Sequence, residues 1–162
     1  MRIFALALML GGTACRTDCS PNAPGRVDIG TGETGFIPLD PTDPTFELVH
    51  GPQGGWHVLI GLDAAGLNAT DIVVAQIVGS FGDDVVAKNE SAWLGFVCNS
   101  ETETLQVSNT FLIFDDKRFD SPCPLHDQML TVEVTLPDSD GNDIVGTTTA
   151  RVDDPRHDEC EE

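Results

Sequence analysis

The clearest pattern along the chain is a period of two between apolar and polar residues. In residues 130–136 (LTVEVTL) every second side chain is leucine or valine, and threonine or glutamate stands between them. Residues 56–62 (WHVLIGL) place Trp56, Val58, Ile60 and Leu62 on one face, and His57, Leu59 and Gly61 on the other. Because side chains two apart on a β-strand point to the same side, each run predicts a strand with one buried face.

Shorter segments of the same kind fill most of the remaining chain. They lie at residues 26–32, 36–39, 46–48, 72–78, 92–98, 105–114 and 144–152, and one more follows Asp83 and Asp84. Prolines and glycines separate them, and the sequence has no heptad pattern and no long amphipathic helix. The pattern therefore predicts an all-β fold, an immunoglobulin-like antiparallel β-sandwich of about seven to nine strands.

Two turns are prominent between these strands. Residues 137–143 (PDSDGND) join the last two alternating runs, and Asp-Gly in this position is a strong hairpin signal. This ending resembles the last hairpin of immunoglobulin-like domains in bacterial surface proteins.

The other turn is a hinge that lies between two apolar runs. It consists of Gly51, Pro52, Gln53, Gly54 and Gly55. Glycine reaches backbone angles that other residues avoid, so we expect at least one of the last two glycines to have a positive φ.

The N-terminal residues have the pattern of an export signal. Arg2 precedes a short apolar run, residues 3–10, which is too short to span a bilayer but has the length of a signal-peptide core. Small residues and then Cys15 follow, as in the bacterial lipobox, where the cysteine is lipidated; Gly12 stands where such boxes usually carry leucine. Ordinary signal-peptidase cleavage is the alternative.

The expected organisation has four parts. Residues 1–14 are a signal peptide, residues 15–25 a lipid-anchor tether, residues 26–155 the sandwich and residues 156–162 an acidic tail.

Composition limits the partners of this domain. The 162 residues fit one domain, and 27 acidic residues against 8 basic ones give a formal net charge of −19. Such a field repels nucleic acid and anionic membrane surfaces and favours cations or basic partners. Acidity that only keeps an exported protein soluble is the simpler explanation.

Five cysteines are consistent with an oxidising compartment. If Cys15 carries lipid, four remain for two disulfides, and we expect Cys98 to pair with Cys123 and Cys19 with Cys160. Four cysteines allow three pairings. A zinc site is the rival use, but the sequence contains no CxxC spacing.

Candidate metal ligands lie at both turns. His50 and His57, completed by His126 or a carboxylate, would suit copper or zinc, although histidines at strand ends often only hydrogen-bond locally. At the other turn, Ca²⁺ could use the oxygens of Asp138, Asp140, Asn142 and Asp143, but a solvated hairpin tip explains them as well.

Catalytic motifs are lacking in the sequence. It has no GxSxG, no HExxH and no phosphate-binding loop with lysine, so we expect no enzyme and no bound cofactor.

Together these features define a narrower resemblance. A signal ending at cysteine, a first strand containing GTG and a GPQGGWH hinge before an apolar strand resemble uncharacterised lipoproteins of myxobacteria and related bacteria. The resemblance implies an envelope location, at the outer membrane or cell surface, with simple secretion as the alternative.

The expected function is a binding or structural module that is attached to the membrane only by its lipid. Its partner would be an envelope or extracellular protein or ligand, not nucleic acid. A small metal-binding protein or metalloenzyme that uses His50 and His57 is the second hypothesis.

Overall fold

The computed structural model describes residue 19 and residues 21–52, 54–68 and 72–156. In this part of the chain ten strands form and no helix does. The strands are β1 (Arg26–Thr31), β2 (Ile37–Pro38), β3 (Thr45–His50), β4 (Trp56–Ala65), β5 (Val73–Phe81), β6 (Asp84–Leu94), β7 (Val97–Asn99), β8 (Thr104–Ile113), β9 (Met129–Pro137) and β10 (Asp143–Asp153). A search of the described residues for a helix with the length and hydropathy of a membrane span finds none.

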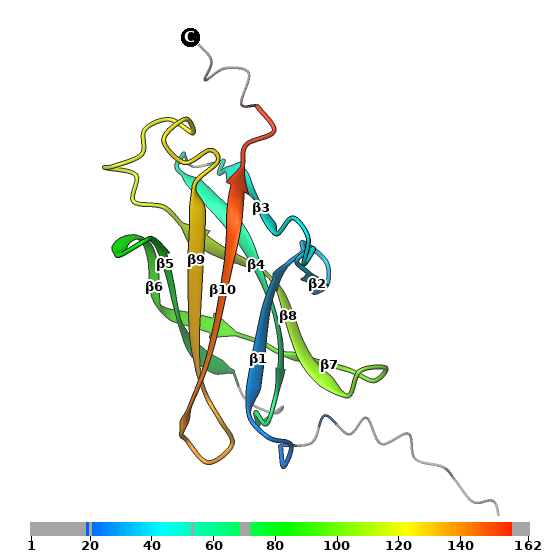
Figure 1. Ribbon diagram of the computed structural model, residues 1–162. Helices are drawn as coiled ribbons and strands as arrows, with labels where there is room; N and C mark the ends of the chain where they lie inside the picture. The colour runs from blue at the N-terminus through cyan, green and yellow to red at the C-terminus, as the bar shows by residue number, and fades with distance from the viewer. Residues whose placement is uncertain (1–18, 20, 53, 69–71, 157–162) are drawn as a thin grey trace, which may run out of the picture.

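The strands form one curled sheet whose two halves face each other (Figure 1). In one half β4 pairs with β8 along one edge and with β1 and β3 along the other. In the other half the order is β10-β9-β5-β6. Strand β3 joins the halves, because Thr45–Glu47 pair with β10 and Leu48–His50 pair with β4.

The structure is all-β, and the facing halves of its curled sheet are consistent with a β-sandwich, so the predicted all-β fold class is confirmed. Two details differ from the expectation. The sheet has ten strands instead of seven to nine, and the two shortest of them, β2 and β7, contain only two and three residues. It is also not wholly antiparallel, since β3 runs parallel to β10.

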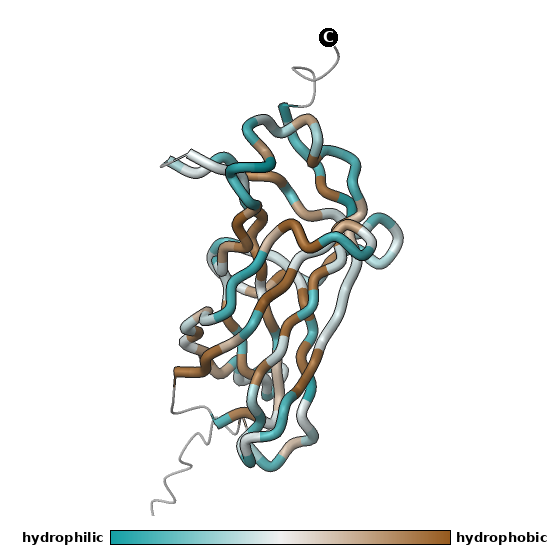
Figure 2. The backbone as a smooth tube through the Cα atoms, turned by 90° about the vertical axis from the view of Figure 1, so that its left-hand side faces the viewer, coloured by the Kyte–Doolittle hydropathy of each residue, from teal (hydrophilic) through white to brown (hydrophobic). Residues whose placement is uncertain are grey.

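The core lies between the two halves and follows the predicted alternation. Polar and apolar residues alternate along the strands in Figure 2. The inward side chains of β4 and β9 are almost completely buried: Val58, Ile60, Leu62, Leu130, Val132, Val134 and Leu136. The predicted turn at residues 137–143 does join β9 to β10 as an antiparallel hairpin, with Gly141 at a φ of 84°.

One predicted strand is divided in the structure. Residues 92–98 read as a single apolar strand, but Leu94 ends β6 and Val97 begins β7. Strand β6 pairs with β5 whereas β7 pairs with β8, so the chain crosses between the halves at Gly95 and Phe96. Apolar content does not reveal such a crossing, because both pieces pack on the same core.

The disulfide pairing differs from the expected one. Cys19 is bonded to Cys98, with their Cα atoms 5.8 Å apart, so the expected bond between Cys98 and Cys123 is wrong. The reason is the length of β8, whose ten residues separate the two positions by roughly 33 Å. Cys123 is itself disulfide-bonded. Because Cys19 is bonded to Cys98, the expected bond between Cys19 and Cys160 is also wrong. Cys15 and Cys160 lie outside the described residues.

The bond attaches the N-terminal segment to the end of the sandwich that carries the β9–β10 hairpin (Figure 1). Cys19 is buried, and the Ser139 hydroxyl donates a hydrogen bond of 3.1 Å to the Pro21 carbonyl. Gly66, with a φ of 78°, lies so close that an added Cβ would be 2.7 Å from the Ala23 carbonyl oxygen. The described part of the predicted tether, Cys19 and residues 21–25, therefore contacts the folded domain.

We predict that non-reducing peptide mapping of the purified protein recovers Cys19 joined to Cys98. The bond closes a separation of 79 residues, for which the chain-entropy model gives about 4.5 kcal/mol. The double variant Cys19→Ser/Cys98→Ser should lose stability of that order in denaturant unfolding. Recovery of Cys98 joined to Cys123 would contradict the structure.

Candidate functional site

The hinge is a compact turn closed by its own backbone. The Gly51 amide donates to the Gly55 carbonyl at 3.0 Å, and the Gly54 amide donates to the Gly51 carbonyl at 3.0 Å. Gly54 and Gly55 have φ angles of 86° and 80°, which confirms the expected left-handed conformation at this turn. Gln53 lies outside the described residues.

His57 lies beneath this turn on the outer face of β4. Its ring packs edge-on against Phe111 with centroids 4.8 Å apart, and an added Cβ on Gly51 would be 3.6 Å from the same ring. Burial lowers the pKa of His57 below its ordinary value, and the nearby His50 lowers it further. The His57 imidazole is therefore uncharged at neutral pH.

His50 points to a different neighbour. Its ring lies 4.7 Å from the ring of Trp56, and the Arg156 guanidinium lies 4.8 Å from that same ring. His126 belongs to the loop before β9, where its Nδ1 accepts a hydrogen bond of 3.2 Å from the Asp154 amide. Among the residues that the structure describes, no three histidine, cysteine or acidic side chains gather as metal ligands.

The predicted calcium ligands form the β9–β10 turn itself. The Asp138 carboxylate accepts hydrogen bonds from the amides of Asp140 and Asn142 at 2.8 and 2.7 Å, and from the side chain of Asn142. These bonds, that from the Asn142 side chain first, lower the pKa of Asp138. Asp143 is the first residue of β10 and pairs with Pro137. The oxygens of Asp138 are thus used within the turn, as in an ordinary Asx-type turn.

Apolar side chains next to the hinge remain exposed to solvent. Phe111 and Ile113 of β8 have exposed fractions of 45% and 58%, and they stand opposite Leu59 and His57 in the pairing with β4. Together with Gly51, Pro52, Gly54 and His57 they line a cleft of about 270 Å³. We call His57, Leu59, Phe111 and Ile113 the hinge strip.

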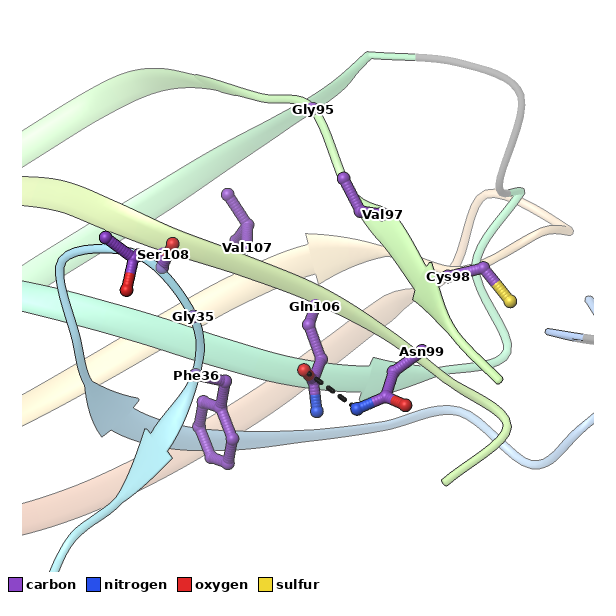
Figure 3. Close-up of a pocket in the computed structure, with 10 residues that line it drawn as sticks. Gly35, Phe36, Gly95, Val97, Cys98, Asn99, Gln106, Val107 and Ser108 are labelled. Carbon is purple, nitrogen blue, oxygen red and sulfur yellow. Dashed lines mark hydrogen bonds between the residues drawn. The ribbon is translucent and has the colours of Figure 1, made fainter. Parts of the chain in front are cut away.

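A second concave region lies on the same half of the sandwich, around β7 and β8 (Figure 3). Its volume is about 350 Å³. We call it the amide groove. It is lined by Thr34, Gly35, Phe36, Gly95, Val97, Cys98, Asn99, Gln106, Val107 and Ser108.

Behind the amide groove lies a buried carboxylate. Asp63 is only 6% exposed, and its Oδ2 accepts hydrogen bonds from Thr104 at 2.7 Å and Gln106 at 2.6 Å. Arg26 contacts its other oxygen at 3.2 Å, so the charge is both paired and hydrogen-bonded. Asp63 is not among the site residues predicted from the sequence. The available signal was a charged residue directly after the apolar run 56–62, within a strand.

The chain was compared with protein-family models, curated proteins and solved structures, and none of the three comparisons finds a match.

We predict that Gly54→Val and Gly55→Val each lower the free energy of unfolding by at least ~1 kcal/mol, because a β-branched residue is strained at positive φ. An added Cβ meets no atom within 4 Å at either position, so strain is the only expected cause. Gly95→Val is the matched control, because Gly95 has the same open space without a positive φ. Equal losses in all three variants, measured by denaturant unfolding, would refute the explanation.

Proposed function

We propose that the protein is an exported, lipid-anchored binding module of the bacterial envelope, which contacts a protein partner through the hinge strip. The observation that carries this proposal is the exposure of Phe111 and Ile113 beside the apolar cleft of the hinge. Contiguous apolar patches on soluble domains commonly mark interaction sites, whereas single exposed apolar residues do not.

The geometry of the hinge strip supports binding over a purely structural explanation. Hydrogen bonds within the turn fix the backbone on one side of the cleft, and the packing of His57 against Phe111 fixes the side chains at its base. A preformed surface of this kind loses little conformational freedom when a partner binds. The partner is expected to insert an apolar side chain between the turn and Phe111.

Charges around the hinge strip indicate the chemistry of the partner. Glu33 and Glu47 line the adjacent cleft together with Leu59, and Asp115 lies beside Ile113 at the other end. Lys88 lies near that end too, but it is paired with Glu90. With a net charge of −19, the module favours a segment in which lysine or arginine flanks apolar residues.

The anchor part of the proposal rests on the sequence around Cys15. We predict that Cys15→Ala moves the protein from the membrane fraction to the soluble exported fraction of the cell. Mass spectrometry of the wild-type protein should find acyl chains on a mature N-terminal Cys15. An unmodified Cys15 at the mature N-terminus would exclude the lipid anchor while leaving the hinge strip untouched.

The binding part is tested with two synthetic peptides, one alternating leucine with lysine and one alternating leucine with glutamate. We predict that the lysine peptide binds and the glutamate peptide does not. Phe111→Ser and Ile113→Ser should each weaken binding about tenfold or more, as truncation of a central apolar contact does. Titration calorimetry measures the affinities.

Trp93→Ser is the matched control, because Trp93 is an exposed aromatic residue (73%) on β6, outside the hinge strip. Denaturant unfolding of each variant separates lost binding from lost folding. Equal binding of both peptides, or unchanged binding in the Phe111 and Ile113 variants, would exclude the hinge strip as the contact surface.

A further inference from the structure

We propose that the amide groove is a binding site for a neutral saccharide, separate from the hinge strip. Its volume of about 350 Å³ lies in the range of small-molecule sites. The residues that form it offer amides, hydroxyls and an aromatic ring, which is the combination that a pyranose ring needs. The hydroxyl groups of the sugar require fixed hydrogen-bond partners, and the C–H face of its ring packs on an aromatic surface.

The buried Asp63 fixes the orientation of two side-chain amides in the groove, those of Gln106 and Asn99. Because a carboxylate only accepts hydrogen bonds, the Gln106 group facing Asp63 at 2.6 Å must be its Nε2. The Oε1 of Gln106 then accepts from the Asn99 Nδ2 at 3.2 Å, the bond drawn in Figure 3. Asn99 Oδ1 accepts in turn from the Glu101 amide at 3.0 Å.

This chain of bonds leaves hydrogen-bonding capacity at the groove. An amide nitrogen carries two N–H groups, and the bonds described use one on Gln106 and one on Asn99. Each residue therefore has a second donor in a preset orientation. The hydroxyl groups of Thr34 and Ser108 line the same groove and can donate or accept.

The aromatic ring of the groove is that of Phe36, and two glycines leave the space that it occupies. Gly30 and Gly61 are partners in the pairing of β1 with β4, and neither has a side chain between the strand and Phe36. An added Cβ would be 2.8 Å from the Phe36 ring at Gly30 and 3.4 Å from it at Gly61. The ring thus packs on bare backbone and stays half-buried, with a defined position beside the amides.

The lining also indicates that the ligand is neutral. None of the ten residues that line the groove carries a charged side chain, in a protein where 22% of residues are charged. A cationic ligand would find no carboxylate to pair with there, and the net charge of −19 disfavours an anionic one.

The test is saturation-transfer NMR of the purified protein with a panel of neutral oligosaccharides built from glucose, galactose, mannose and N-acetylglucosamine. A panel of uronic-acid oligosaccharides is run in parallel. We expect binding to at least one neutral sugar and none to the acidic panel. Asn99→Ala and Phe36→Ala should each weaken binding about tenfold or more, whereas Phe36→Trp, which keeps an aromatic face, should retain it.

Phe111→Ser serves as the control for location, since it alters the hinge strip and leaves the amide groove intact. If no neutral sugar binds, if acidic sugars bind equally, or if Asn99→Ala has no effect in a folded protein, the proposal is overturned. Loss of sugar binding in Phe111→Ser but not in Asn99→Ala would show that the saccharide binds at the hinge strip and would overturn the proposal. The lysine-peptide measurements are independent of all these outcomes.

Discussion

The structure depends on β4, which pairs with three other strands and is buried along almost its whole length. Its inward side chains, Val58, Ile60 and Leu62, are fully excluded from solvent, and they supply a large part of the apolar area that stabilises the fold. Its edges pair with β8, β1 and β3, so its backbone groups are satisfied on both sides. Its partner β3 also pairs with β10, and β4 is thereby linked to the other half of the sandwich.

The same strand positions both candidate surfaces. His57 and Leu59 face outward at its beginning and form half of the hinge strip, whereas Gly61 and Asp63 near its end support Phe36 and Gln106. The alternation of β4 therefore directs one set of side chains to the core and the other set to the outer face, and the length of the strand separates the two candidate surfaces. A change in the register of β4 by one residue would turn the apolar core side chains to the outer face and remove both surfaces together.

The sequence contained much of the fold but only part of the candidate site. Period-two patterns located β4, β9 and β10, because a half-buried strand records its environment in every second residue. The hinge was predictable from its glycines, whose conformational demand is local. The Cys19–Cys98 bond and the amide groove were not predictable, because both join residues that are far apart in the sequence and meet only in the folded sheet, as Asp63 and Gln106 do in adjacent strands.

The Cys19–Cys98 bond also sets how the domain would stand on a membrane. If Cys15 is lipidated, as we propose, the chain between Cys15 and Cys19 can extend by at most about 14 Å. The end with the β9–β10 hairpin would then lie next to the lipid headgroups, and its acidic turn residues would keep it from sinking among anionic ones. The hinge, at the far end of β4, would face outward into the surrounding medium, about 30 Å higher.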